Sequence, residues 1–173
     1  MYVKMIGSLF LMSSATAIGF LKAEELKERV KKLQELKRMM EFLQGELRFH
    51  RSGLSEAFGS VGKRVEEPFC SFLKMMEEQL SEHQAESFED LWEHCSKQLV
   101  LEEGFLKKDL QLVEVLGRGL GYLDLTMQTE TLNQAIIRTE EEIQEAKKQQ
   151  QNKGRLYQTM GITAGALLTL LMV

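Results

Sequence analysis

The sequence is poor in proline and cysteine, with one proline and two cysteines in 173 residues. Two cysteines, Cys70 and Cys95, cannot build a disulfide framework, and they favour a reducing compartment. The scarcity of proline, beside abundant Met, Leu, Glu, Lys and Gln, excludes a collagen-like chain and disfavours sandwiches and barrels. An excess of positive charge is also missing: 22 basic residues face 26 acidic ones, a net charge of −4, which disfavours nucleic-acid binding. The composition therefore predicts an all-α protein.

Patterns typical of catalytic or metal sites are missing as well. The cysteines form no CxxC pair, and no HxxxH pair exists among the three histidines, His50, His83 and His94. Gly117-Arg-Gly119-Leu-Gly121 lacks the preceding strand and the spacing of a phosphate-binding loop, and indicates a loop between helices. No nucleophile, base and oxyanion hole come together. We expect no enzymatic activity, no cofactor and no metal.

Two stretches without charge lie near the ends of the chain, Met5 to Leu21 and Leu156 to Val173. As helices they would be about 26 to 27 Å long, slightly under a hydrocarbon core of about 30 Å, and flanking Lys and Arg side chains can cover the difference. We predict transmembrane helices at residues 1–22 and 156–173, around a helical domain of residues 23–155. A signal peptide is the alternative for the first stretch, and a buried core helix for the second.

The charges beside these stretches predict an orientation. Eleven basic residues lie on the inner flanks, and Lys4 alone lies on the outer flanks. Cytoplasmic flanks carry the excess of Lys and Arg, so residues 22–155 are expected in the cytoplasm, with both termini on the other face of the cell membrane. The inner-flank residues are Lys22, Lys27, Arg29, Lys31, Lys32, Lys37, Arg38, Lys147, Lys148, Lys153 and Arg155.

Apolar residues at helical spacing predict a bundle of six helices in the middle of the chain. One stripe runs from Leu26 to Leu47, a fifth helix starts near Glu103, and a last helix starts at Leu125. The three helices between follow one spacing, i, i+3, i+4, i+7, i+11: Leu54, Ala57, Phe58, Val61, Val65; Phe69, Phe72, Leu73, Met76, Leu80; and Phe88, Leu91, Trp92, Cys95, Leu99. Three such faces need a shared core, and we expect Trp92 to anchor it.

Capping residues set the expected helix boundaries. Pro68 suits a first turn, Ser87 with Asp90 resembles a capping box, and Asp124 is a good N-cap for the last helix. The three glycines from Gly117 to Gly121 are expected to stop the fifth helix, and Gly154 is the expected place for a break in the last one.

Small residues one turn apart occur in both uncharged stretches: Ala15 with Gly19, and Gly161 with Gly165. Such pairs let membrane helices approach closely, so we predict helix packing at these positions. Small residues are also common in membrane helices without this role. Homo-oligomerisation stays open.

Residues 52–103 are strongly acidic, with twelve acidic residues against four basic ones. We predict that Glu77, Glu78, Glu82 and Glu86 form a docking surface for a basic partner. The alternative is an ordinary solvated face.

Two motifs resemble a known family. Leu120-Gly121-Tyr-Leu-Asp124-Leu-Thr-Met-Gln128 is similar to the LGxxDxxxQ of stage III sporulation protein AB, and the segment from Lys153 through Tyr157 to Gly161 and Gly165 is similar to its KxxxYxxxGxxxG. The resemblance covers the whole chain. In this sequence Gly53 replaces the proline that precedes Leu54 in the family pattern.

The resemblance implies a role that the residues alone do not. The family's cytoplasmic part is similar to domains of the F protein, the platform of type II secretion and type IV pilus machines. The resemblance implies membership of a mother-cell membrane complex that links mother cell and forespore. The partners it implies are a secretion-type ATPase similar to stage III sporulation protein AA and other stage III sporulation membrane proteins. An F-like platform or adaptor of another secretion machine, and a membrane-tethered coiled-coil scaffold, are the alternatives.

Overall fold

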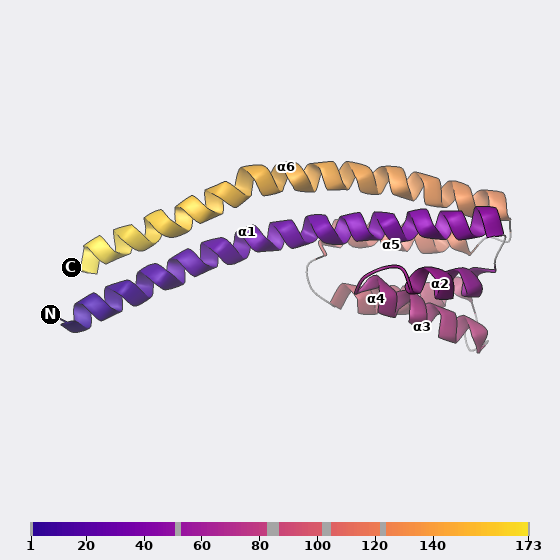
Figure 1. Cartoon of the computed structure of the whole chain (residues 1–173), viewed down its shortest axis with the longest axis horizontal. Helices are drawn as coiled ribbons and strands as arrows, with labels where there is room; N and C mark the ends of the chain where they lie inside the picture. The colour runs from indigo at the N-terminus through magenta and orange to yellow at the C-terminus, as the bar shows by residue number, and fades with distance from the viewer. Residues whose placement is uncertain (1, 51–52, 83–86, 102–104, 122–123, 173) are drawn as a thin grey trace. The chain divides into compact units, whose positions relative to one another are not determined.

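The computed structural model describes residues 2–50, 53–82, 87–101, 105–121 and 124–172, with some side chains within the helices left out. These residues form six α-helices and one π-helical turn, and none of them lies in a strand (Figure 1). The prediction of an all-α, six-helix fold is confirmed. The elements are α1 (Tyr2–Gly45), η1 (Glu46–His50), α2 (Leu54–Gly62), α3 (Phe69–Ser81), α4 (Phe88–Leu101), α5 (Lys107–Leu120) and α6 (Leu125–Met172).

The chain divides into two compact units. The helical unit is Lys31–Ile143, and the arm unit combines Met1–Val30 with Gln144–Val173. The division groups residues 23–30 and 144–155 with the terminal segments, although the sequence pattern assigns them to the domain between those segments.

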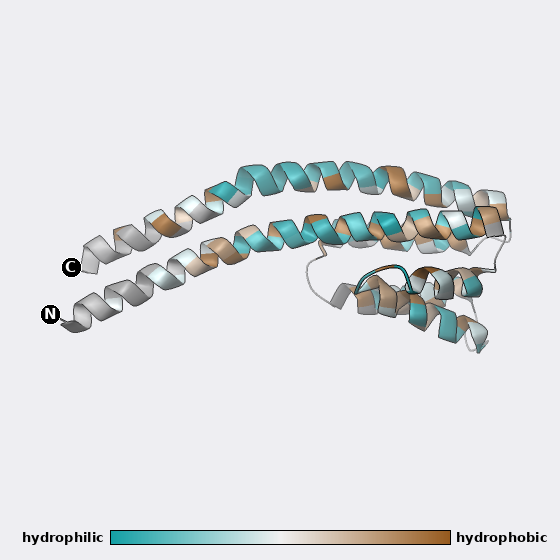
Figure 2. Cartoon of the chain, in the orientation of Figure 1, coloured by the Kyte–Doolittle hydropathy of each residue, from teal (hydrophilic) through white to brown (hydrophobic). Residues whose placement is uncertain are grey.

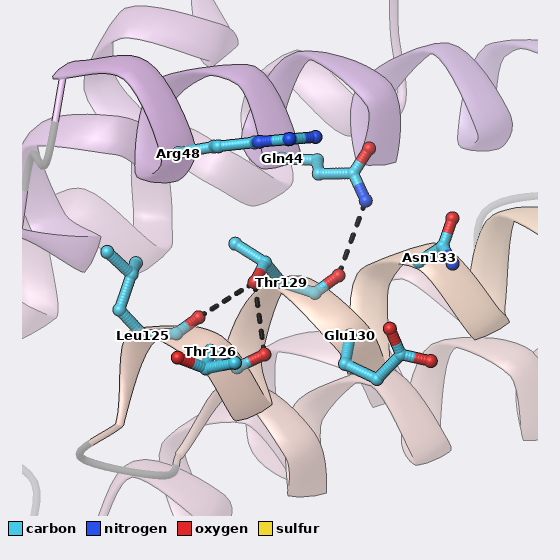
Figure 3. Close-up of a pocket in the computed structure, with 7 residues that line it drawn as sticks. All are labelled: Gln44, Arg48, Leu125, Thr126, Thr129, Glu130 and Asn133. Carbon is cyan, nitrogen blue, oxygen red and sulfur yellow. Dashed lines mark hydrogen bonds between the residues drawn. The ribbon is translucent and has the colours of Figure 1, made fainter.

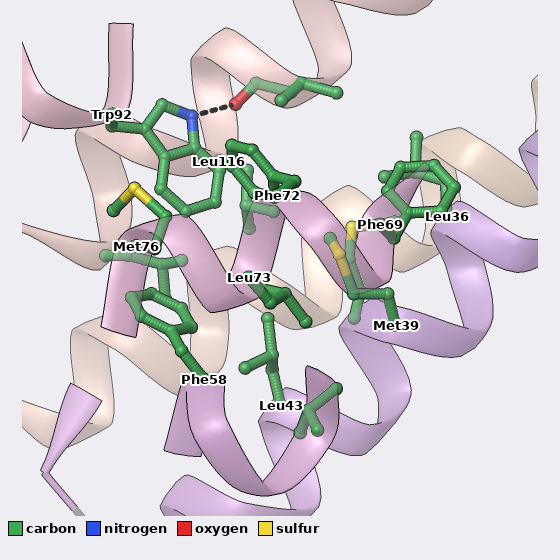
Figure 4. Close-up of a cluster of buried hydrophobic side chains, with 14 of the residues drawn as sticks. Leu36, Met39, Leu43, Phe58, Phe69, Phe72, Leu73, Met76, Trp92 and Leu116 are labelled. Carbon is green, nitrogen blue, oxygen red and sulfur yellow. Dashed lines mark hydrogen bonds between the residues drawn. The ribbon is translucent and has the colours of Figure 1, made fainter. Parts of the chain in front are cut away.

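The core of the helical unit is built from the predicted apolar stripes (Figure 4). Every position of the three equally spaced stripes is buried or half-buried, and all of them lie on α2, α3 and α4 except Val65, which follows the end of α2. The turn of 3.6 residues places these positions on one face of each helix, and the three faces then share one interior. The second part of α1 and η1 add Leu36, Met39, Met40, Leu43 and Leu47 to this core.

Trp92 lies at the centre of an aromatic cluster, as predicted. Its side chain is 2% exposed. The indole Nε1–H donates a hydrogen bond of 2.8 Å to the Val113 carbonyl oxygen on α5. The Phe72 ring meets it edge-on at 5.1 Å between centroids, and the rings of Phe58 and Phe88 lie 6.2 and 5.9 Å away. Trp92 thereby joins α2, α3, α4 and α5.

The expectation that three glycines stop the fifth helix is wrong for two of them. Gly117 and Gly119 lie inside α5, which ends at Leu120 with Gly121 as its C-cap. A Cβ atom on Gly117 would collide with the Trp92 ring, and one on Gly119 would collide with the Thr131 side chain of α6. These two glycines therefore let α4 and α6 approach α5 closely, and the loop expected over 117–121 is helix up to residue 120.

The helix starts follow the predicted caps, with one exception. The Ser87 Oγ accepts a hydrogen bond of 3.1 Å from the Asp90 backbone N–H, as in a capping box. Pro68 immediately precedes α3 as its N-cap residue. The fifth helix begins at Lys107 rather than near Glu103. There the buried Asp109 carboxylate accepts a hydrogen bond of 2.9 Å from the Leu106 backbone N–H, which fixes the first turn.

The last helix differs from the prediction in having no break at Gly154. α6 is helical throughout Leu125–Met172. Glycine weakens a helix by roughly 0.5–1 kcal/mol relative to alanine, which the neighbouring turns can absorb.

No helix is long and apolar enough to cross a membrane in the part of the chain that the structure describes. The expected spanning segments fall partly outside that part, since the side chains of residues 2–6, 8–12 and 168–173 are not described. The transmembrane helices at 1–22 and 156–173 therefore stay a prediction.

Candidate interaction surfaces

The segment Leu120–Gln128, the first of the two motifs that resemble the family, builds the corner between α5 and α6. The Gln128 side-chain amide, which is buried, donates a hydrogen bond of 2.9 Å to the Leu120 carbonyl oxygen at the end of α5. The Asp124 carboxylate accepts one of 3.3 Å from the Thr126 backbone N–H and so caps α6. Because helix ends leave carbonyl and N–H groups without partners, these side chains stabilise both ends of the turn.

An open pocket of about 460 Å³ adjoins this corner (Figure 3). Gln44 of α1 donates a hydrogen bond of 3.3 Å across it to the Thr129 carbonyl oxygen. The Thr129 hydroxyl donates back to the Leu125 and Thr126 carbonyls at 2.9 and 3.0 Å. The full lining is Gln44, Arg48, Leu125, Thr126, Thr129, Glu130 and Asn133.

The pocket offers polar contacts of both charges rather than catalytic groups. Arg48 contributes the cation and Glu130 the anion. The Arg48 guanidinium also lies 5.6 Å from the centre of the Phe49 ring, which is 77% exposed. Such a surface suits a polar polypeptide segment better than an apolar small molecule, since ligand pockets are mostly apolar. The sequence gives no signal for it, because α1 and α6 residues meet there only after folding.

The predicted acidic docking surface is only partly open. Glu78 and Glu82 are exposed, on α3 and at its C-cap, but the Glu77 carboxylate lies over Gly59 of α2 and is half-buried. Glu86 lies outside the described residues. Glu77 therefore has a packing role between α2 and α3, which leaves Glu78 and Glu82 as the described residues that a partner can reach.

A second acidic group, not predicted, lines a pocket of about 280 Å³ between α4 and α5. Glu89 and Glu93 come from α4, and Glu114 comes from α5, with Arg118 beside them. The Glu93 carboxylate forms an ion pair of 2.5 Å with Lys97, and the hydrogen bond raises the pKa of the lysine. Spacing on α4 alone could not reveal this group, because Glu114 joins it from another helix.

The arm unit carries exposed apolar side chains beside charged ones. Figure 2 shows the hydropathy of α1 and α6 along their length. Lys22 and Lys27 pair with Glu25 and Glu24 one turn away, at 2.7 and 2.9 Å. The large apolar residues that are between 44% and 64% exposed in this unit are Ile18, Phe20, Leu21, Leu156, Met160, Ile162 and Leu167.

The second family motif and the small-residue pairs also lie in the arm unit. Lys153 is exposed and Tyr157 is half-buried. Gly19 is buried, but the surroundings of Ala15, Gly161 and Gly165 lie outside the described residues. The predicted packing of these pairs stays a prediction.

Groups that could hold a metal ion, three or more His, Cys, Asp or Glu side chains, do not occur among the residues that the structure describes. Cys95 is fully buried in the core, and burial raises the pKa of its thiol, which keeps it protonated. The buried position of Cys95 fits its place in the apolar stripe of α4.

The comparisons with known proteins agree with the motifs. The family model for stage III sporulation protein AB matches residues 4–173. Stage III sporulation protein AB of Bacillus subtilis (strain 168) is 23% identical over 171 residues, which cover 99% of both chains. A solved structure of stage III sporulation protein AB shares the fold, with a TM-score of 0.66 at 20% identity over 72% of this chain and 98% of that one. The chain belongs to the stage III sporulation protein AB family.

Proposed function

We propose that this chain is a non-enzymatic membrane platform of the sporulating cell. The arm unit attaches it to the mother-cell membrane, and the helical unit lies in the cytoplasm. There it docks a secretion-type ATPase similar to stage III sporulation protein AA, within a complex of other stage III sporulation membrane proteins.

The observation that carries this proposal is where the exposed apolar side chains lie. Of the twelve large apolar side chains exposed among the described residues, seven belong to the arm unit, at residues 18–21 and 156–167. The helical unit instead buries its apolar stripes around Trp92. Exposed apolar side chains gathered in one part of a folded protein mark an interaction with membrane or protein. Here all seven fall within the two uncharged stretches, residues 5–21 and 156–173.

Charge supports the docking role of the helical unit. Residues 31–143 hold 14 basic and 22 acidic residues, a formal net charge of −8. A field of one sign speeds the encounter with a partner of the opposite sign. The exposed Glu78 and Glu82 belong to this acidic unit, which also carries two pockets with charged linings.

The test is binding of the purified ATPase to the full chain in lipid nanodiscs. In the test variant Glu78, Glu82 and Glu86 are changed to lysine, and Glu77 is left in place because it packs on Gly59. The matched control changes Glu24, Glu41 and Glu141 to lysine, three exposed acidic residues of α1 and α6 outside the acidic segment and the pocket at Gln44. Exposed ion pairs contribute about 0.2–1 kcal/mol each, so the test variant should bind on the order of tenfold more weakly, with a flatter salt dependence.

Three outcomes are distinguishable in that experiment. A selective loss in the test variant supports ATPase docking at α3. Equal binding by parent, test and control variants would contradict a docking role for the acidic surface. Absence of ATPase binding to the parent chain would favour the membrane-tethered scaffold, and association with components of another secretion machine would favour the adaptor.

A further inference from the structure

The charge of the chain is divided between its two units. The arm unit holds eight basic and four acidic residues, a formal net charge of +4, beside the −8 of the helical unit. The apolar side chains that the arm exposes therefore lie on a basic background. A basic, apolar surface complements the negatively charged headgroups and hydrocarbon of an anionic bilayer.

The basic residues of the arm differ in how they are neutralised. On α1, Lys22 and Lys27 are paired with Glu25 and Glu24. On α6, Glu145 is the acidic residue nearest in sequence to the basic residues 147–155, and its carboxylate accepts a hydrogen bond of 2.9 Å from the Gln149 side chain. Lys148, Lys153 and Arg155 are exposed and form no ion pair with the residues that the structure describes, and Lys147 is half-buried beside them.

These four residues lie directly before the exposed apolar segment of α6. Leu156 follows Arg155, and Met160, Ile162 and Leu167 continue along the helix, all of them exposed. Lys147 to Arg155 covers about two turns of helix, and its four charges point around the axis rather than along one side. A helix that enters a bilayer at residue 156 would therefore surround its entry point with positive charge, whichever way it is rotated.

From this geometry we infer that residues 147–155 of α6 form a collar that selects anionic phospholipids around the arm unit. The inference rests on the proposed membrane attachment and names the lipid that the attachment prefers. Free phosphate would pair with the four positive charges, but it would leave the apolar side chains beyond residue 155 exposed. The ligand is therefore a lipid in a bilayer.

The test uses the full chain in vesicles of phosphatidylcholine that contain a spin-labelled phospholipid with either an anionic or a zwitterionic headgroup. The collar variant combines Lys147→Gln, Lys148→Gln, Lys153→Gln and Arg155→Gln. The matched control removes four exposed charges from the helical unit with Lys63→Gln, Lys74→Gln, Lys97→Gln and Arg118→Gln. The fraction of motionally restricted label gives the preference for each lipid at the protein boundary.

If the collar exists, the parent and the control should restrict the anionic label severalfold more than the zwitterionic one. The collar variant should lose this preference, and high salt should weaken it in the parent, because salt screens the headgroups. Equal restriction of both labels by the incorporated parent would overturn the collar but leave the membrane platform intact. A parent chain that stays outside vesicles of every composition, including purely anionic ones, would overturn the membrane attachment as well.

Discussion

At the scale of single residues, close approach between helices depends on the glycines of α5. Gly117 faces Trp92, whose ring is held in place by the bond to Val113 and by the rings of Phe72 and Phe58. A ring fixed on several sides cannot shift to admit a methyl group, and cores at native density respond strongly to one added carbon.

Gly117→Ala should destabilise the helical unit by about 1–2 kcal/mol, because overpacking against the indole exceeds the gain in helix propensity. Urea unfolding followed by fluorescence measures this, since Trp92 is the single tryptophan of the chain. Gly45→Ala is the matched control: nothing lies within 4 Å of the Cβ it adds, so its stability should stay equal or rise slightly. Equal unfolding midpoints for parent and Gly117→Ala would show that α4 and α5 are not packed this closely.

At the scale of helices, the corner between α5 and α6 depends on one buried side chain. Gln128 supplies the hydrogen bond that the last carbonyl of α5 lacks within the helix. On the solvated face of α6, by contrast, the Gln134 side-chain amide donates an exposed hydrogen bond of 3.1 Å to the Glu130 carboxylate.

Gln128→Ala should therefore cost about 1–3 kcal/mol of unfolding free energy, since it leaves a buried acceptor without a partner. Gln134→Ala removes the same group from the solvated face of α6 and should change the stability by less than about 0.5 kcal/mol. Thermal unfolding by circular dichroism compares the two variants. Similar losses for both would mean that the corner is held by apolar packing alone.

Most of the helices could be predicted from the sequence, because period and capping act locally. The stripes on α2, α3 and α4 and the caps at Ser87 and Asp124 follow from spacing within a few residues. The roles of Gly117 and Gly119 could not be predicted, because the side chains they admit come from α4 and α6. From the sequence alone a glycine predicts the end of a helix, and only the neighbouring helices show that it serves close packing instead.

The interaction surfaces were less predictable than the helices. An acidic segment predicts negative charge, but it does not show which carboxylates face a neighbouring helix. Glu77 is the example, because its carboxylate packs on Gly59 of α2 instead of facing solvent. The pockets at Gln44 and at Glu114 each combine two helices, so no single stretch of sequence contains them. The residues of the LGxxDxxxQ motif turned out to fix a corner, with the polar pocket beside it.

At the scale of the whole molecule, the two units carry opposite charge and different apolar exposure. The arm unit is basic with exposed apolar side chains, and the helical unit is acidic with a buried core. Basic residues beside a membrane helix favour the cytoplasmic face, so this distribution also predicts an orientation. The central claim is that both ends of the chain enter the membrane from a cytoplasmic helical unit.

Cysteine labelling in intact sporulating cells tests that claim most directly. The background is Cys70→Ser, with Cys95 retained because its buried thiol, whose pKa is raised by burial, should not react. Single cysteines are then introduced as Tyr2→Cys and Gln149→Cys. The account predicts that a membrane-impermeant maleimide labels residue 2 in intact cells and residue 149 only after permeabilisation. Labelling of residue 149 in intact cells, with residue 2 protected, would contradict it.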